Sequence, residues 1–482
     1  MDINNLEKKI EDYATATHNP YIGGPFAPVF EEIVANNLEV IGEIPQDING
    51  AYMRNGPNPK YTPIGHYHWF DGDGMVHALY IQDGKAIYKN KWVKTIDYKK
   101  DDKAGKALWD GVMGNMKNNE MNKRLPLKDT ANTAVFFHNK YLYAGWYMCG
   151  EAYKMDPWTL DTFGTTSFGD TLKTGIMAHV KVDQQTDEVM FFDYGPTPPF
   201  LTYGILKDNK VTHFCEIDIP GPRIPHDMAI TKNYSILMDL PLVMDEDALA
   251  NGRSKIVFKQ NLQSRFGILP RYGSNKDVKW FATNPCYIYH VVNAWEENDE
   301  IVLDVCLNEK PNPQKGVKDP VEKLKAYLRL EAHYHRYRFN LKTGQTKEEY
   351  IDDRLTEFPM INAYKQGEKT RYSYHQKFDI SDTIRFEGVI KYDTKTDSSQ
   401  TYLYGEGCFG SESPFIPRKG ATDEDDGYIV SFITNANTKK SEARILDAKN
   451  IGSEPLAIIK LPQRVPLGFH ACWIPGEEIK KT

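Results

Sequence analysis

The sequence lacks several features that would place it in a membrane, in an export pathway or on nucleic acid. No apolar run approaches the roughly 20 residues that a transmembrane helix needs. The N-terminal stretch is polar and acidic, without the apolar segment of a secretory signal. The net charge is −7 and the pI is about 6.0, so we expect no nucleic-acid partner. These absences predict a cytoplasmic protein.

Cysteine motifs and nucleotide motifs are also missing. No Cys-x-x-Cys pair is present, which argues against a zinc ribbon or a dithiol redox site. We expect the six scattered cysteines to be free thiols of a reducing compartment. The segment from Gly405 to Gly410 matches GxGxxG, but no helix start follows it, so we reject a dinucleotide site. The Asp71-Gly-Asp-Gly stretch lacks the glutamate that a calcium loop needs and is typical of a tight turn.

Short β-type runs separated by turn residues fill most of the chain. Examples are residues 86–93, 188–194 and 400–404, and such even spacing favours an all-β, closed architecture. Helical patterns are few: we expect one at residues 6–16 and one at residues 319–328, where Pro320 suits a first turn. No domain boundary is evident. We therefore expect a single domain over residues 1–482, in which residues 1–20 form an N-terminal extension that includes the helical pattern at residues 6–16.

A weak internal repeat points to a propeller. Apolar strands run into similar polar turns at Asp183, Asn340 and Asp393. The last two are one blade length apart, since a four-stranded blade takes roughly 40–50 residues. Seven blades with insertions would account for the 482 residues. The alternative is that such hairpin turns recur in any β protein.

Two pairs of histidines are close in sequence. His66 and His68 are two residues apart, as are His333 and His335, so each pair could lie on one face of a strand and chelate a metal. Their tyrosine and arginine neighbours favour a surface position or an aromatic cluster instead.

Four other histidines share a different context, because each lies in a short apolar run of β type where a side chain is expected to be buried. They are His179, His226, His290 and His470. A buried imidazole needs hydrogen bonds or a metal. Taken singly, each is explained by a hydrogen-bonded core position. Taken together, they would form a site for Zn, Cu, Fe or Ni if a propeller brought their strands to one axis.

Two glutamates are candidates to orient such imidazoles through the second ring nitrogen. Glu357 begins Glu-Phe-Pro-Met-Ile-Asn, and Glu412 begins Glu-Ser-Pro-Phe-Ile-Pro-Arg. A buried carboxylate is costly unless it has a partner, and an imidazole would be one. Ordinary turn carboxylates remain the alternative.

The motifs taken together resemble those of the carotenoid cleavage oxygenase family. The resemblance rests on the segments 50–59 and 68–75, on the four histidine blocks and on the two glutamate motifs, which run in family order from about residue 20 to the C-terminus. It implies a seven-bladed β-propeller with a dome of loops and helices over an axial iron site. It further implies one Fe(II) per chain held by the four histidines, and cleavage of a conjugated alkene by O₂ into two carbonyl products.

The resemblance also assigns further positions. Glu357 and Glu412 match glutamates that orient the iron-binding histidines of the family. A third such glutamate is replaced by Met148, and Glu151 could substitute only after a local shift of register. One histidine is then expected to be held by another group. This departure concerns iron affinity rather than the class of reaction.

Three positions match residues of the family's substrate tunnel: Phe70, Thr133 and Tyr147. Stilbene and vinylphenol cleavers carry a lysine where this chain has Tyr147, so a carotenoid or apocarotenoid is the favoured substrate and a phenylpropanoid the alternative. A propeller that binds apolar ligands without catalysis, or an isomerase, is less favoured. The segment from Pro196 to Leu206 is our candidate for peripheral contact with a membrane.

Overall fold

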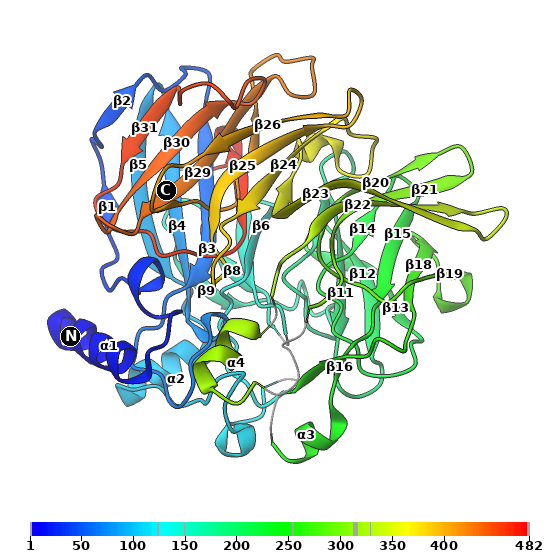
Figure 1. Ribbon diagram of the computed structural model, residues 1–482, viewed down its shortest axis with the longest axis horizontal. Coiled ribbons are helices and arrows are strands. Elements are labelled where there is room, and N and C mark those ends of the chain that lie inside the picture. The colour runs from blue at the N-terminus through cyan, green and yellow to red at the C-terminus, as the bar shows by residue number, and fades with distance from the viewer. Residues whose placement is uncertain are drawn as a thin grey trace.

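The computed structural model describes residues 2–122, 125–148, 150–252, 255–311, 317–327 and 329–479. Within these residues the strands form seven antiparallel blades and one separate hairpin (Figure 1). We number the blades in chain order, and within each blade we call the strand nearest the axis the inner strand. The expected seven-bladed, all-β architecture is confirmed.

The first three blades are separate sheets. Blade 1 contains, in spatial order, β1 (Val34–Ala35), β5 (Lys85–Trp92), β4 (Gly74–Gln82), β3 (Gly50–Pro57) and β32 (Ala471–Pro475). Blade 2 contains β6 (Ala134–His138), β7 (Tyr141–Gly145), β8 (Tyr153–Met155) and β9 (Thr162–Thr165). Blade 3 contains β10 (Lys181–Asp183), β11 (Glu188–Tyr194), β12 (Leu201–Lys207) and β13 (Lys210–Ile217).

The next three blades include one shared strand. Blade 4 contains β14 (Ala229–Ile230), β15 (Tyr234–Asp239), β18 (Ser264–Pro270) and β19 (Lys279–Thr283). Blade 5 contains β20 (Tyr287–Glu297), β21 (Glu300–Asn308), β22 (His333–Asn340) and the first part of β23 (Thr346–Met360). Blade 6 contains the last part of β23, β24 (Tyr372–Phe378), β25 (Phe386–Asp393) and β26 (Ser398–Leu403).

Strand β23 passes from the outer edge of blade 5 to the axis of blade 6. Its residues 346–355 pair with β22, and its residues 356–360 pair with β24. An outer strand that continues into the next inner strand is how a propeller advances around its axis. The seven-stranded sheet therefore counts as two blades.

The chain ends close the ring. Blade 7 contains β27 (Cys408–Phe409), β28 (Phe415–Pro417), β29 (Gly427–Asn435), β30 (Lys440–Asp447) and β31 (Ala457–Lys460), and β2 (Val40–Gly42) completes its outer edge. The N-terminal segment thus pairs with the last blade through β2 and β31, while the C-terminal strand β32 pairs with β3 of the first. Because both ends are used, no blade is left with an unpaired inner strand in the described structure.

Burial is most complete in strands that lie second from the axis. Every residue of β3 and of β11 is buried, whereas β26 at an outer edge is almost entirely exposed. Both faces of β3 and β11 are covered, so these strands bury polar residues such as Arg54 and Asp193 along with their apolar ones.

The helices lie together on one side of the strands and form the expected dome (Figure 1). In the described chain they are α1 (Ile3–Thr17), α2 (Ile96–Ala104), α3 (Glu246–Ala250) and α4 (Pro320–Ala326), and the hairpin of β16 (Leu242–Met244) and β17 (Ile256–Phe258) accompanies α3. Short 3-10 turns occur at Gly24–Phe26, Trp69–Asp71, Met116–Asn118, Asn275–Asp277, Ala363–Lys365 and Gly476–Glu478.

The expected helices at residues 6–16 and 319–328 correspond to α1 and α4, while α2 and α3 were not predicted. The α2 helix has a clear start and stop. The Thr95 hydroxyl accepts a hydrogen bond from the Tyr98 amide, and Gly105 ends the helix with φ +67°. These capping residues were present in the sequence, but the charged run between them hid the helix.

The repeated turns are only partly equivalent. Asn340 and Asp393 each end the third strand of consecutive blades, whereas Asp183 ends the inner strand of blade 3. In all three, the side-chain oxygen accepts hydrogen bonds from amides two and three residues further along. The repeated sequence pattern therefore predicted the type of turn correctly at all three positions. It reflected the repeat of the blades only at Asn340 and Asp393.

The five described cysteines are free thiols, as expected, and Cys149 lies outside the described residues. They are Cys215, Cys286, Cys306, Cys408 and Cys472.

Gly56 marks the closest approach of β3 to the segment that leads into β32. A Cβ atom added at Gly56 would lie 2.8 Å from the Gly468 Cα. We expect Gly56→Ala to destabilise the protein by about 1–3 kcal/mol, because backbone cannot move away as a side chain would. Thermal unfolding measures this effect. Gly23→Ala is the matched control, since a Cβ there meets nothing within 4 Å, and equal melting temperatures for the two variants would contradict the prediction.

Candidate metal centre

The four separated histidines come together at the axis. His179, His226 and His470 lie just before β10, β14 and β32, and His290 lies within β20. Each of these strands is the inner strand of its blade. The four ligand atoms lie within 4.8 Å of one another, a spacing that can hold a metal ion. Ring centroids of neighbouring imidazoles are 4.5–5.2 Å apart.

The other three blades place further predicted residues at the same end of their inner strands. Thr133 directly precedes β6, Glu357 lies in the blade 6 part of β23, and Glu412 lies between β27 and β28. Every blade therefore contributes one of the predicted residues to the axial region. The ring geometry explains why these residues are far apart in sequence.

Two bulges turn side chains of this set towards the axis. The pairing of β20 with β21 shifts between Ile288 and Val291, on either side of His290. The pairing of β23 with β24 shifts after Glu357, where Phe358 has φ +48°. A bulge re-aims a side chain, and positive φ is strained for an aromatic residue. The strained backbone at Phe358 is therefore directly next to Glu357, a residue whose orientation matters to the site.

Glu357 and Glu412 each contact one histidine. The Glu357 carboxylate pairs with His290 Nδ1 and accepts a 2.7 Å hydrogen bond from the Phe358 amide. The Glu412 carboxylate lies 3.0 Å from His470 Nδ1 and accepts a 2.6 Å hydrogen bond from the Ala471 amide. With Nδ1 engaged, Nε2 of each ring is left for the centre.

Three of the four imidazoles, those of His179, His226 and His290, have a lowered pKa that favours the neutral form. Burial, followed by the charges of neighbouring histidines and Lys181, holds the pKa of His179 and of His290 well below its usual range. Burial lowers the pKa of His226 to about 3. Nε2 of His179 and Nε2 of His290 are buried without a hydrogen-bond partner. Neutral imidazoles with unpartnered nitrogens aimed at one point fit a metal ion.

The pKa of Glu357 is shifted upwards, whereas the pKa values of the neighbouring histidines are shifted downwards. Burial and the charges of Asp227 and Glu412 raise its pKa well above the usual range, and its side chain is fully buried. A cation held by His290 would offset this cost, because it would attract the carboxylate through the imidazole.

A mainly apolar cavity adjoins the histidines. Its lining contains the three predicted tunnel residues Phe70, Thr133 and Tyr147, together with His226, His290, His470, Tyr289, Leu330, Phe358 and Phe469. Sequence reasoning missed the last four. Three of these directly neighbour a predicted residue in the chain, at 289, 358 and 469, and that adjacency was an available signal.

The comparisons agree with this geometry. Residues 26–475 match the family model described as retinal pigment epithelial membrane protein. Carotenoid 9,10(9',10')-cleavage dioxygenase 1 of Pisum sativum is 37% identical over 97% of this chain and 92% of its own length. The corresponding enzyme of Crocus sativus is 36% identical over 95% and 90%.

The chain belongs to the carotenoid cleavage oxygenase family.

Solved structures of this family match the fold. Lignostilbene dioxygenase of Pseudomonas brassicacearum has a TM-score of 0.86 at 27% identity, covering 95% of this chain and 99% of that one. Cobalt-substituted apocarotenoid oxygenase of Synechocystis has a TM-score of 0.84 at 24% identity, covering 97% and 99%. The second likeness supports the fold alone.

At the position of the family's third glutamate, Met148 is buried, and its sulfur lies 3.8 Å from the Tyr194 hydroxyl. Glu151 is not among the residues that line the cavity, and its amide donates to Asp129. Among the described residues, no carboxylate is hydrogen bonded to the His226 ring, whose aromatic neighbours include Tyr147 and Tyr289. His226 thus lacks the kind of partner that His290 and His470 have.

The histidines that cluster in sequence serve other purposes. His66 is exposed, and His68 accepts a hydrogen bond from the Phe70 amide as the cap of a 3-10 turn. His77 pairs with the Tyr88 hydroxyl at 2.7 Å. His335 packs against Tyr337 and Tyr350. The surface or aromatic role expected for these pairs agrees with their contacts.

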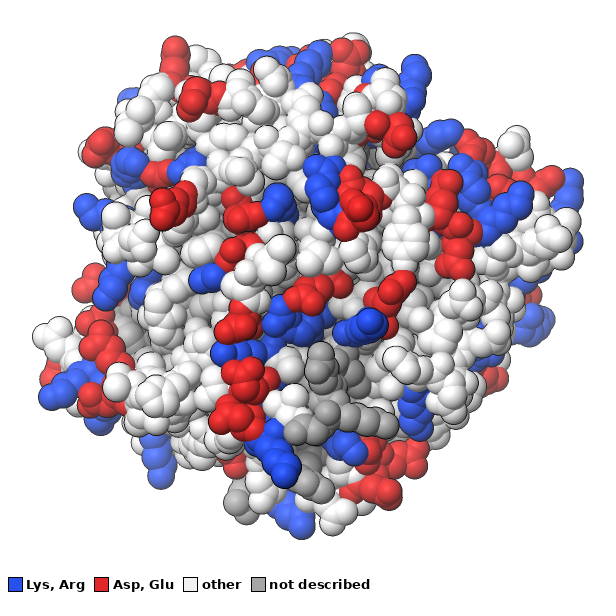
Figure 2. All heavy atoms as spheres, in the orientation of Figure 1, with Lys and Arg blue, Asp and Glu red and all other residues white. Residues whose placement is uncertain are grey.

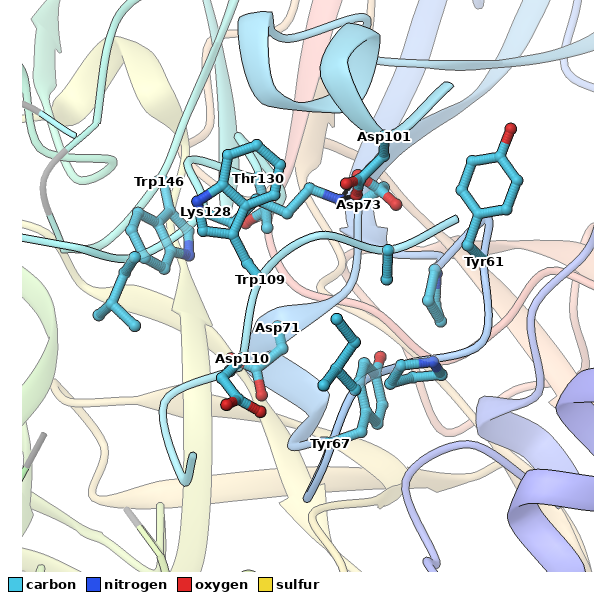
Figure 3. Close-up of a pocket in the computed structure, with 16 residues that line it drawn as sticks. Tyr61, Tyr67, Asp71, Asp73, Asp101, Trp109, Asp110, Lys128, Thr130 and Trp146 are labelled. Carbon is cyan, nitrogen blue, oxygen red and sulfur yellow. Dashed lines mark hydrogen bonds and ion pairs between the residues drawn. The ribbon is translucent and has the colours of Figure 1, made fainter. Parts of the chain in front are cut away.

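Figure 3 shows a second, more polar pocket. Consecutive residues face the two spaces: Phe70 and Tyr147 line the cavity, while Asp71 and Trp146 line the polar pocket. The Lys128 ammonium there bridges Asp73 and Asp101 at 2.5 and 2.6 Å. The lining includes no histidine, so this pocket is separate from the metal centre.

Acidic and basic side chains are interspersed over the face shown in Figure 2, so neither charge sign forms a patch among the residues coloured there. In the segment from Pro196 to Leu206, the side chains of Leu201, Ile205 and Leu206 are buried, whereas Pro198 is exposed and Phe200 is half-buried. Membrane contact through this segment stays a prediction. Every helix in the described ranges is too short or too polar to cross a bilayer.

Proposed function

We propose that this chain is a non-haem iron dioxygenase that cleaves a conjugated C=C bond of a carotenoid or apocarotenoid. One C=C bond and O₂ are converted into two carbonyl groups, which balances without another reductant. The observation that carries the proposal is the set of four converging histidines beside an apolar cavity. The relatives named for carotenoid cleavage support the substrate class.

His179, His226, His290 and His470 would hold one Fe(II), as the all-nitrogen donor set suits iron. Bound iron supplies the one-electron chemistry that lets triplet O₂ react with an alkene. Glu357 and Glu412 fix two of the rings, and the aromatic wall excludes water and orients the polyene.

A phenylpropanoid substrate is the second candidate. Isoeugenol monooxygenase of Pseudomonas nitroreducens is 30% identical over 95% of this chain, and one matching structure is a lignostilbene dioxygenase. However, among the residues that the structure describes, the cavity lining has no cationic side chain to bind a phenolate. The family resemblance also places Tyr147 where stilbene cleavers carry lysine. These observations favour the apolar polyene.

Metal analysis after anaerobic purification, followed by incubation with O₂, tests the proposal. The substrates are a panel of carotenoids and apocarotenoids and a panel of stilbenes and vinylphenols. We expect about one iron per chain and aldehyde or ketone products from the polyenes only. Protein without iron, or turnover confined to the phenols, would overturn the proposal.

A further inference from the structure

A buried ion pair lies directly behind the metal centre. The Lys181 ammonium is 2.8 Å from Oδ1 and 3.0 Å from Oδ2 of Asp227. The Asp227 side chain is 2% exposed and that of Lys181 is 13% exposed. Asp227 directly follows His226, and Lys181 is the second residue after His179. The pair therefore joins the histidine segments of blades 3 and 4.

The same carboxylate also reaches blade 5. Asp227 Oδ2 accepts a 2.8 Å hydrogen bond from the amide of Val291, the residue after His290, and Oδ1 accepts one of 2.7 Å from the Met228 amide. The ladder between β20 and β21 is shifted on both sides of Val291. An amide in a disrupted ladder needs another acceptor. Three segments that carry three of the four histidines thus meet at one side chain.

We propose that Asp227 is a positioning residue for the metal centre, and that Lys181 holds its carboxylate in place. This inference rests on the proposed function, because it assumes a metal at the four histidines. Glu357 and Glu412 act on His290 and His470 through their ring nitrogens. Asp227 acts instead on the backbone beside His226 and His290, and through Lys181 on the segment of His179. Because Met148 provides no carboxylate for the His226 ring, Asp227 restrains the backbone beside His226 instead.

Burying an ion pair between three blades costs desolvation free energy, and replacing such pairs with apolar residues is often neutral for stability. Apolar side chains could not accept the amides of Val291 and Met228, however. The requirement for these two acceptors, beside a centre that must keep one geometry, is a physical reason for Asp227.

Cobalt(II) binding tests the positioning role without substrate or turnover. The visible absorption of bound Co(II), read in competition with a chelator of known affinity, gives a dissociation constant. We expect Asp227→Asn to weaken binding by about 10–100-fold, the usual effect of losing an outer partner of a metal ligand. We also expect the Co(II) bands to broaden, since the rings would take several orientations.

A double variant separates position from charge. Asp227→Asn leaves the Lys181 ammonium uncompensated near the metal, and repulsion alone would weaken binding. The double variant Lys181→Met with Asp227→Asn restores the net charge of the pair, but the ion pair and one of the two acceptor oxygens stay lost, because the asparagine NH2 group cannot accept a hydrogen bond from an amide. We expect the double variant to bind Co(II) as weakly as Asp227→Asn, within about threefold. Recovery of wild-type affinity would overturn the positioning role.

The matched control is another buried Lys–Asp pair, Lys391 with Asp425, whose side chains are 4% and 12% exposed. The variant Lys391→Met with Asp425→Asn should lower the melting temperature yet leave Co(II) affinity unchanged. Equal losses of affinity in the two double variants would show that any buried pair matters only through stability, and would overturn the proposal.

Hydrogen–deuterium exchange of the unaltered protein gives an answer even where a variant fails to fold. We expect peptides containing Val291 to be protected in the metal-free protein, because Asp227 already holds that amide. Protection that arises only after Co(II) is added would overturn the proposal. Wild-type protein that binds neither Co(II) nor Fe(II) would instead refute the proposed function, so the two failures are distinguishable.

Discussion

Replacing His290 with alanine is expected to remove iron from the protein and to reduce turnover by more than about 100-fold. Loss of an outer partner of a metal ligand costs about 10–100-fold, and loss of the ligand itself should exceed that range. His290 is also the partner of Glu357, so the variant leaves a fully buried carboxylate without its imidazole. We expect an additional loss of about 1–3 kcal/mol in stability. Metal content per chain, product formation and thermal unfolding measure the three effects.

His138→Ala is the control for this experiment. His138 is a buried histidine at the end of β6; its Nε2 lacks a hydrogen-bond partner, as Nε2 of His290 does, and its Nδ1 lies 3.6 Å from the Asp187 carboxylate, as Nδ1 of His290 faces that of Glu357. It lies outside the four-histidine group. The control should therefore lose stability but keep its iron and its activity. Full iron content in His290→Ala would refute the assignment of this residue as a ligand.

Glu357→Gln is expected to move the stability of the metal-free and iron-bound protein in opposite directions. The pKa of Glu357 is raised in the folded protein, chiefly by burial, so the ionised side chain opposes folding above the unfolded pKa of about 4.5. Glutamine removes that cost, and the metal-free variant should melt at a higher temperature than wild type at neutral pH. The gain should disappear as the pH falls towards 4.5, where the unfolded carboxyl also becomes protonated.

With iron bound, the same substitution should be unfavourable. Glutamine cannot carry the negative charge that attracts the metal-bound imidazole of His290, so we expect affinity for iron to fall about 10–100-fold. Melting temperatures with and without metal, measured across pH, test both signs. Glu348→Gln is the control, because Glu348 is partly exposed and lies beside His335, away from the centre. Destabilisation of the metal-free Glu357→Gln protein at neutral pH would contradict this account.

Local sequence patterns were sufficient for the elements of the fold and for the identity of the four histidines. Apolar runs of β type around His179 and His290 indicated burial, because a side chain in such a run has nowhere else to go. The turns after Asn340 and Asp393 were readable because an Asx side chain bonds to amides two and three residues on. The four scattered histidines were better guides than the clustered His66 and His68.

Non-local features could not be read in this way. The bulges beside His290 and Glu357 depend on which strand lies opposite, and a sequence does not state its register. The contact of Asp227 with Val291 joins separate blades. The sequence also does not state which part of the apolar segment from Pro196 to Leu206 is buried: Leu201 and Ile205 are buried in blade 3, while Pro198 is exposed.

The sequence by itself therefore determined the strands, their turns, the family and the residues able to bind a metal, since these follow from local hydrogen bonding, from apolar periodicity and from shared motifs. Only the tertiary structure decided that the four imidazoles share one centre and that Asp227 lies behind them. That outcome depends on closing a ring of seven blades, in which β2 and β32 pair with strands from the opposite end of the chain. Contacts made by ring closure join residues hundreds of positions apart, and no local pattern specifies them.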